Sequence, residues 1–292
     1  MLHELSGDRI QSLSRPLKAN AGIVSVAFTS LEASWTADEV RCYRAQDFSP
    51  HYGMKQKHEY ISLLGNLKYH ETADFECCCI PLRLGDKSNV TGLGLFLVLM
   101  RPKIKGNIYG LQRALRPSTF HSVLDAFDNI ETSERKILLP KMILPDEQLE
   151  GQPVDFVDHW TATKLLAEDD TFDEVTAGVR LGHFLHYSSI SFDEDGVGFC
   201  YPRSVTGSSS DSSLRNVTHK GVPAEDNFSL RFDSPFMFLL VDRTHRIPFI
   251  CGCYAGQPAL SVERLRSTRP TSSVCNTNCA KFWNILATNI SA

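Results

Sequence analysis

Val179–Phe192 reads Val-Arg-Leu-Gly-His-Phe-Leu-His-Tyr-Ser-Ser-Ile-Ser-Phe, and the acidic glycine turn Asp193-Glu194-Asp195-Gly196 follows it directly. The apolar and β-branched residues predict a buried strand that ends at this turn. A long polar segment comes next, with a serine-rich part at 207–213, before apolar sequence resumes at 232–236. This order predicts an exposed loop held at both ends, which is where a protease cuts a folded chain first.

Composition and charge restrict the class of protein. The chain has 292 residues, of which 42% are hydrophobic, so it can bury a sizeable core in one large domain or two small ones. A formal net charge of −4 and the lack of a dense basic cluster argue against a nucleic-acid partner. The longest apolar run, 93–100, is too short to span a membrane, and the polar segment 2–13 is no signal peptide. We therefore expect neither nucleic acid nor membrane as a partner.

The cysteines favour burial over metal binding. There are nine, and their odd number and irregular spacing argue against a full disulfide framework. Cys251, Cys253, Cys275 and Cys279 could in principle form a zinc site. The favoured interpretation is that Cys251 and Cys253 lie on one face of an apolar strand as small hydrophobic residues, and that 77–79 also belongs to a strand. We expect no metal and no cofactor.

Four Asn-x-Ser/Thr sequons lie in predicted loops or in the tail, at Asn89, Asn216, Asn227 and Asn289. They are candidate glycosylation sites and weakly favour an extracellular protein, with a cytoplasmic one as the alternative.

Hydrophobic periodicity places further elements along the chain. Strands are predicted at 23–31, 41–48, 56–64, 66–75, 76–84, 93–100, 236–241 and 247–254. Helices are predicted at 107–115, 117–127 and 156–168. The helix at 117–127 is the clearest, because Phe120, Val123, Leu124 and Phe127 form one apolar stripe and Pro117 suits its first turn.

The predicted strand and turn resemble the hinge of the serpin family. Its members carry a His in the strand, then Glu-Glu-Gly at the hinge, and Pro-Phe after the loop. Here His186, Glu194-Asp195-Gly196 and Pro235-Phe236 stand at these positions. Trp35 and Leu139-Pro140-Lys141 match two further family motifs, and the chain closes with a similar apolar hairpin.

The resemblance covers about 7–260 and implies a serpin-like α+β fold. That fold has a large central β-sheet, smaller β-sheets, a few helices and an exposed reactive-centre-type loop. Trp35, Lys141 and His186 are expected to be structural residues at the top of the sheet. No counterpart of the family's first third is found. We assign 1–260 to the serpin-like domain and 261–292 to a Ser/Thr/Asn-rich tail.

The resemblance also implies a function, that of a serine-type endopeptidase inhibitor, which is not an enzyme. A serine protease cuts the loop, and the cut loop then enters the sheet as a new strand. The basic residues Arg215 and Lys220 are candidate residues for the scissile bond. No hydrolase, zincin or phosphate-loop motif is present.

The hinge composition departs from the family, which has Thr, Glu and several Ala after Gly196. Val197, Phe199 and Tyr201 fall on one side of an extended chain, and two of them are bulky. Forcing a large ring into a packed slot costs about 1–3 kcal/mol. Pro202 lacks the N–H that a central strand needs. This composition favours the alternative of a non-inhibitory serpin that acts as a binding or carrier protein.

Overall fold

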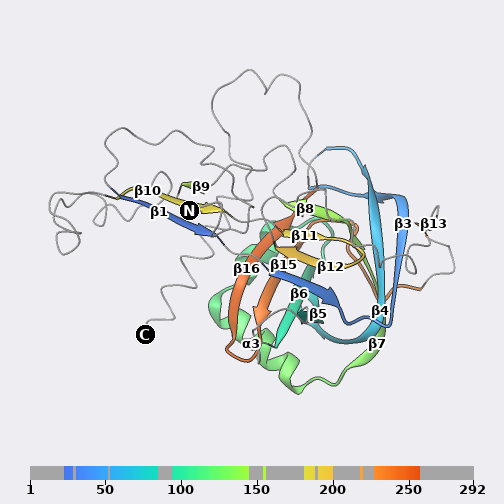
Figure 1. The fold of residues 1–292 in the computed structure, drawn as a ribbon. Coiled ribbons are helices and arrows are strands. Elements are labelled where there is room, and N and C mark those ends of the chain that lie inside the picture. Colours follow the sequence, from blue (N-terminus) through green and yellow to red (C-terminus); the bar gives the residue numbers. More distant parts are fainter. Residues whose placement is uncertain are drawn as a thin grey trace. The chain divides into compact units, whose positions relative to one another are not determined.

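The computed structural model describes the parts of the chain that carry most of the predicted elements. The described residues are 23–28, 31–51, 53–84, 94–144, 154–155, 181–187, 190–199, 218–219 and 227–256. The predicted helix at 156–168 and the tail lie outside these residues. So do Asn89, Asn216, Asn289, Tyr201, Pro202, Arg215 and Lys220. The chain forms two compact units, each of which is described separately (Figure 1).

The first unit contains a three-stranded sheet. Strand β1 (Ile23–Phe28) runs parallel to β10 (Leu181–Tyr187), and β9 (Val154–Asp155) is antiparallel to β10. The strand predicted at 23–31 therefore stops at Phe28, and the chain forms a separate strand β2 at Leu31–Trp35.

The first unit also contains the end of the long strand predicted at 179–192. In place of one strand, β10 is followed by a separate strand β11 (Ile190–Phe192), which pairs antiparallel with β8 (Met142–Leu144). On its other side β11 pairs with β12 (Gly196–Phe199). The segment after the acidic turn, which the sequence predicts to be an exposed loop, thus begins with a strand.

The second unit contains a sheet built on a long strand, β4 (Gln56–Glu71), which pairs antiparallel with β3 (Glu39–Phe48) and β7 (Ser133–Pro140). The sequence predicts separate strands at 56–64 and 66–75. The predicted break at Gly65 is wrong, since β4 continues through this residue. A glycine suits this position because an added Cβ would lie 3.3 Å from the backbone of Ala37. Two short strands complete this sheet: β13 (Thr218–His219) beside β3 and β14 (Leu230–Arg231) beside β7.

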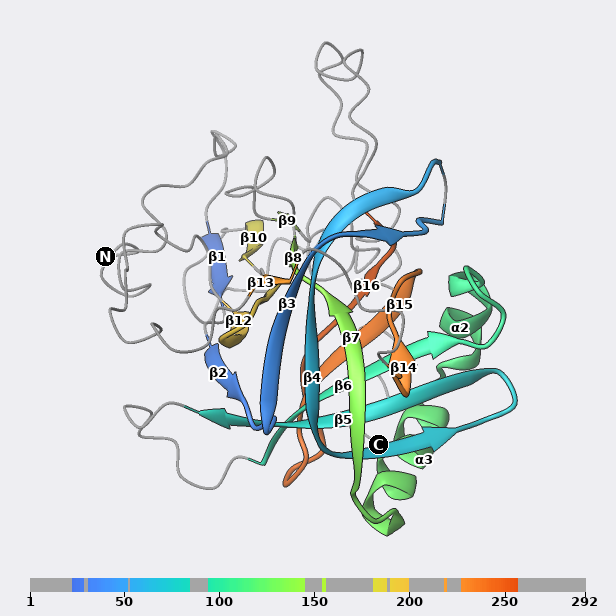
Figure 2. The same cartoon turned by 90° about the vertical axis from the view of Figure 1, so that its right-hand side faces the viewer.

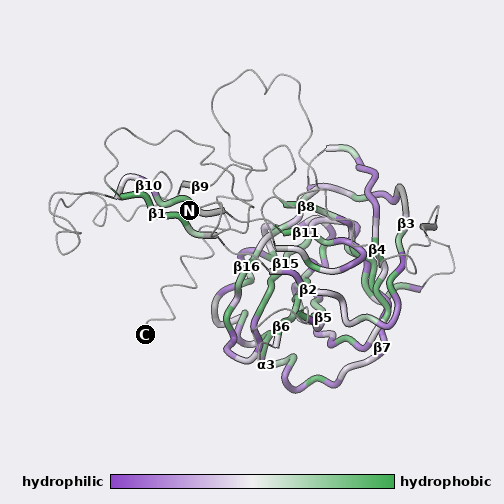
Figure 3. The backbone as a smooth tube through the Cα atoms, viewed as in Figure 1, coloured by the Kyte–Doolittle hydropathy of each residue, from purple (hydrophilic) through white to green (hydrophobic). Residues whose placement is uncertain are grey.

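The other strands of the second unit are highly apolar. Strands β5 (Phe75–Leu84), β6 (Leu95–Pro102), β15 (Phe236–Asp242) and β16 (Ile247–Tyr254) pair antiparallel in this order. The closing hairpin predicted from the sequence is confirmed as β15 and β16. All seven residues of β15 are buried, and Figure 3 colours β15 and β16 mostly as hydrophobic. Residues 33–35 of β2 pair with β5.

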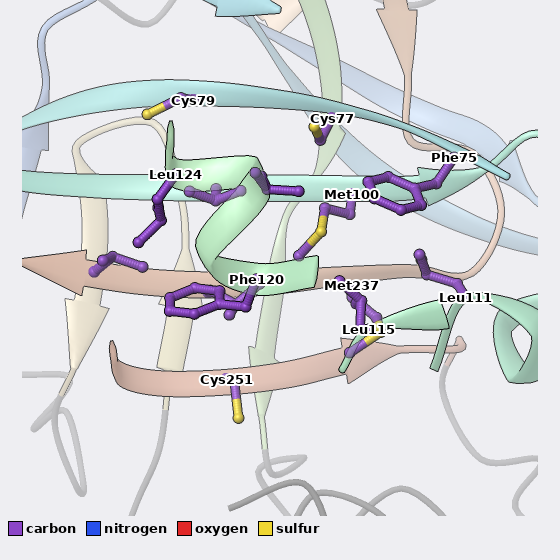
Figure 4. Packing of buried hydrophobic residues seen from close by; sticks show 14 of the residues in the cluster. Phe75, Cys77, Cys79, Met100, Leu111, Leu115, Phe120, Leu124, Met237 and Cys251 are labelled. Atoms are coloured by element: carbon purple, nitrogen blue, oxygen red, sulfur yellow. The ribbon is translucent and has the colours of Figure 1, made fainter. Parts of the chain in front are cut away.

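Two helices cover one face of these four strands. Helix α2 (Ile108–Ala114) begins at Asn107, whose side-chain oxygen accepts the N–H of Gly110, and α3 (Pro117–Asn129) begins at a proline. Both predicted helices are confirmed. The stripe of Phe120, Val123, Leu124 and Phe127 is buried against the strands, and Figure 4 shows Phe120 and Leu124 of this stripe. None of the described helices is long and apolar enough to cross a membrane.

The strand interpretation of the cysteines is confirmed where the structure describes them. Cys77, Cys78 and Cys79 are buried in β5, and Cys251 and Cys253 are buried in β16. All five are free thiols. Cys77, Cys79, Cys251 and Cys253 belong to the core beneath the helices, and Figure 4 shows the first three. Burial raises the pKa of the Cys251 thiol to about 12, so these side chains act as small hydrophobic residues.

Candidate hinge site

The acidic turn Asp193–Gly196 is held by its own first residue. The Asp193 carboxylate accepts the backbone N–H of Asp195 at 3.0 Å and that of Gly196 at 3.1 Å. The backbone N–H of Asp193 donates to the carbonyl oxygen of Gly196 at 3.1 Å. An Asp whose side chain bonds the backbone two and three residues later stabilises a tight turn. The hinge residues that the sequence indicated therefore begin inside a fixed turn.

Trp35 anchors this turn to β2. Its indole Nε1–H donates to the carbonyl oxygen of Asp193 at 2.7 Å, and its side chain is 7% exposed. The sequence had given Trp35 a structural role at the end of a sheet strand. Among the described residues the structure brings Trp35, at the end of β2, into direct contact with the hinge turn (Figure 2 shows where β2 lies beside β5).

Lys141 holds the second residue of the turn. Its ammonium lies 2.6 Å from a carboxylate oxygen of Glu194 and 3.5 Å from one of Glu59. Burial disfavours the charged amine, but the hydrogen bond with Glu194 and the nearby negative groups outweigh it, so the pKa of Lys141 is raised. Lys141 is the single residue between β7 and β8. Its backbone N–H donates to the carbonyl oxygen of Glu59 at 2.8 Å.

Two members of this site were missed by the sequence analysis. Glu59 lies in β4, far from the hinge motif in sequence, and Cys42 lies in β3 with a raised thiol pKa caused by burial and opposed by Lys141. No local pattern marks either residue. Asp193 was named only as part of the turn, although an Asp three residues before a Gly is a signal for its turn-fixing role.

Only glycine fits at position 196, because two backbone segments approach each other closely there. A Cβ on Gly196 would lie 1.9 Å from the carbonyl oxygen of Ala33 in β2. Any side chain here would displace the hinge from β2, because contacts under 3.0 Å to backbone atoms cannot be relieved by a rotamer change. The family position that carries glycine is therefore filled by the residue that this geometry requires.

The residues after Gly196 extend along β11. Phe192 pairs with Val197 and Ser191 with Gly198, and the Val197 side chain is 2% exposed. Strand alternation places Phe199 at a position on the same side as Val197. The sequence had identified this side as the one that must enter a packed interior.

The remaining predicted residues are placed as follows. His186 lies in β10 of the first unit, where its backbone pairs with Ala27 and Val154, and its side chain is not described. Asn227 is exposed immediately before Phe228, over whose ring Lys136 and Arg231 lie at 5.0 and 5.3 Å. Among the described residues, no group of three His, Cys, Asp or Glu side chains could hold a metal ion.

Comparisons with known proteins agree with this geometry. A family model described as "Serpin (serine protease inhibitor)" matches residues 2–255. The fold and the anchored hinge define an α+β protein in which a sheet strand ends at an anchored turn. The chain belongs to the serpin family, whose members are generally protease inhibitors rather than enzymes. No curated protein sequence matches it.

Solved structures of two serpins are similar to this fold. Thyroxine-binding globulin in complex with thyroxine has a TM-score of 0.61 at 14% identity, and the alignment covers 87% of this chain and 62% of that one. The thermophilic serpin tengpin in its native state has a TM-score of 0.54 at 16% identity, with 87% and 61% covered. The chain thus spans less than two thirds of the length of these relatives. Identities this low establish the fold alone.

Proposed function

We propose that this protein engages serine-type endopeptidases through the segment after Gly196 and that it inhibits them poorly, because its hinge carries the bulky Phe199 and Tyr201 followed by Pro202. The observation that carries the proposal is the pairing of β12 with β11, in which Val197 is already buried. Family membership supports a serine protease as the partner.

The sequence beyond β12 argues against further insertion. Trapping requires the cut loop to add residue after residue to the sheet before the acyl-enzyme is hydrolysed. Tyr201 follows Phe199 on the same side of an extended chain, and Pro202 cannot donate a ladder hydrogen bond. We infer that insertion of the cut loop stops near Pro202, so that most protease molecules cleave the loop and dissociate in active form.

Between residues 210 and 224 the loop offers two basic residues, Arg215 and Lys220, to a trypsin-like protease. We propose that cleavage falls after one of them, and that the protein works outside the cell, where exposed Asn227 would carry a glycan. Asn89 and Asn216 are further acceptor candidates in this proposal.

A gain-of-function experiment tests the proposal. The full chain is incubated with a panel of serine proteases, and SDS-stable adducts, residual protease activity and loop cleavage are measured together. We expect cleavage with little adduct, and little change in melting temperature after cleavage. The variant Phe199→Ala/Tyr201→Ala/Pro202→Ala should increase the adduct fraction several-fold, whereas the control Pro223→Ala, later in the loop, should not.

Two outcomes would overturn the proposal. Abundant adduct with the unmodified chain would show that Pro202 does not stall insertion. Resistance of the loop to every protease in the panel would remove serine proteases as partners and favour a carrier role.

The cavity beside α2, lined by residues that include Pro102, Ile104 and Leu111, holds only about 100 Å³. Drug-sized ligand pockets are about 300–1,000 Å³, so this cavity does not support a carrier role.

A further inference from the structure

The core beneath α2 and α3 concentrates the sulfur of this chain. The whole sequence has nine cysteines and five methionines in 292 residues. In this core, six of the ten strand residues carry sulfur, namely Cys77, Cys79, Met100, Met237, Cys251 and Cys253. They come from four neighbouring strands, β5, β6, β15 and β16. Any apolar side chain could fill these positions, so the concentration of sulfur points to a use beyond packing.

Three of these side chains form a row at directly opposed strand positions. Cys77 of β5 pairs with Met100 of β6, and Met100 pairs with Met237 of β15. Opposed side chains on one face of an antiparallel pair have Cβ atoms about 4.5–5.5 Å apart. All three residues are buried, and Figure 4 shows them on three neighbouring strands. Methionine has three rotatable bonds and adapts its sulfur position easily, so the three sulfur atoms can converge on one point.

The donor set selects the kind of ion. Thioether and thiolate sulfur are soft ligands, which favour Cu(I). In the described part of the chain, His, Cys, Asp and Glu side chains alone provide no group of three for a metal ion, so the two thioethers are what completes this set. Thioethers carry no charge, and a single thiolate neutralises a monovalent cation. A neutral complex is tolerated in an apolar core, whereas an unpaired ion is not.

Binding at this row is coupled to the release of a proton. The Cys77 thiol donates to the carbonyl oxygen of His70 at 3.3 Å, and burial raises the pKa of this thiol. The ion displaces the thiol proton, which passes to solvent, as the metal–sulfur bond forms. No electron is transferred, since sulfur and metal keep their oxidation states. The affinity for the ion should therefore rise with pH.

A cavity adjoins the row and offers an approach to it. The cavity beside α2 measures about 100 Å³ and has Pro102 and Leu111 in its lining. Pro102 lies two residues after Met100 in β6 and therefore shares its face of the sheet. Leu111 of α2 packs in the same core as the sulfur row. A cavity that is too small for a drug-sized ligand is large enough for a single ion.

We propose that Cys77, Met100 and Met237 form a binding site for a soft monovalent metal ion, Cu(I), with one thiolate and two thioethers as ligands. The cysteine spacing that disfavours a zinc site does not disfavour this one, because its ligands come from three different strands. The site shares no residue with the hinge, so the proposal does not rest on the proposed function.

Nuclear magnetic resonance of the full chain tests the site directly. The protein is labelled with carbon-13 at its methionine methyl groups, and the five signals are assigned with single Met→Leu variants. Ag(I) is the probe, because it is a soft monovalent ion that air does not oxidise. We expect the signals of Met100 and Met237 to shift together and to saturate at one equivalent. The signals of exposed Met54 and of Met142 in β8 should stay in place.

Competition with a chromophoric Cu(I) chelator measures the affinity. The unmodified chain is compared with Met100→Leu/Met237→Leu and with the control Met54→Leu/Met142→Leu. Leucine matches methionine in volume, so both variants should fold, which thermal melting verifies. We expect the affinity for the first ion to fall at least tenfold in Met100→Leu/Met237→Leu and to stay unchanged in the control.

A pair of neighbouring cysteines provides the second comparison. Cys77→Ala should weaken binding of the first ion, whereas Cys78→Ala, on the opposite face of β5, should not. Equal losses in these two variants would overturn the proposal. So would an unchanged affinity in Met100→Leu/Met237→Leu, or an Ag(I)-induced shift of the Met54 signal alone, since the ion would then bind elsewhere.

Discussion

Trp35 donates its indole N–H to the carbonyl oxygen of Asp193, although 158 residues separate them in the chain. This one hydrogen bond ties the end of β2 to the turn from which the loop departs. Since the hydrogen bond is part-buried and 2.7 Å long, removing its donor removes a stabilising interaction of the Asp193 carbonyl oxygen. The hinge is therefore held by a contact that no local sequence pattern displays.

Trp35→Phe should loosen the hinge specifically. Loss of the indole donor should lower the free energy of unfolding by about 1–2 kcal/mol and should speed limited proteolysis close to residues 193–199. Urea denaturation and mass spectrometry of the early fragments measure the two effects. Tyr69→Phe is the matched control, since it removes hydroxyl bonds to Glu71 and Glu76 away from the hinge. Equal hinge cleavage in both variants would contradict the assignment.

Lys141 and Glu194 should be energetically coupled. A double-mutant cycle with Lys141→Met and Glu194→Gln should give a coupling energy of about 1 kcal/mol, since the pair is partly buried and 2.6 Å apart. A second cycle with Glu59→Gln should give a smaller value because its contact is 3.5 Å. Coupling that is absent from the first cycle would refute the role of Lys141 at the hinge.

The same pair predicts a loss of stability at high pH. Because the folded pKa of Lys141 is raised, its contribution is complete below the unfolded pKa of about 10.4. It is lost as the pH rises through the higher folded pKa. The difference in unfolding free energy between the unmodified chain and Lys141→Met should therefore shrink at strongly alkaline pH, as followed by urea titrations from pH 8 upward.

Gly196→Ala and Gly198→Ala should differ sharply. The new Cβ at Gly196 would meet the Ala33 carbonyl oxygen at 1.9 Å, whereas the one at Gly198 would meet the Ser191 hydroxyl at 2.4 Å, which can rotate away. We expect Gly196→Ala to lower the melting temperature and to expose 197–199 to thermolysin, and Gly198→Ala to change both only slightly. The reverse ranking would show that β12 does not lie as described.

Buried His58 should make the protein less stable in mild acid. The ring is 6% exposed, lies within 3.4 Å of the Tyr254 hydroxyl and packs on Phe48, and burial lowers its pKa. As the pH falls below the unfolded value of about 6.5, the unfolded state binds a proton that the folded state does not, so stability falls.

The check is the urea midpoint at pH 7.5 and pH 5.0. The drop between them should be smaller in His58→Gln than in the unmodified chain, while His121→Gln, at an exposed position of α3, should leave the drop unchanged. An identical drop in all three proteins would remove His58 as its source.

The sequence by itself determined the elements whose signals are local. The stripe of α3, the proline at its start and the apolar closing hairpin each follow from spacing within a few residues, and the acidic turn follows from its Asp and Gly. The hinge motif, Trp35 and the motif with Lys141, taken together with their order along the chain, were also enough to identify the family. The uninterrupted course of β4 through Gly65 was not predictable, because it depends on partners on both sides of the strand.

Only the tertiary structure decided what holds the hinge. The partners of the turn are Trp35 of β2 and Lys141, which directly follows β7 and also contacts Glu59 of β4; these contacts join residues far apart in sequence. Position 196 requires glycine because the carbonyl oxygen of Ala33 in β2 leaves no room for a Cβ atom. Such contacts are fixed by packing between distant segments, whereas spacing and composition report only the propensities of neighbouring residues.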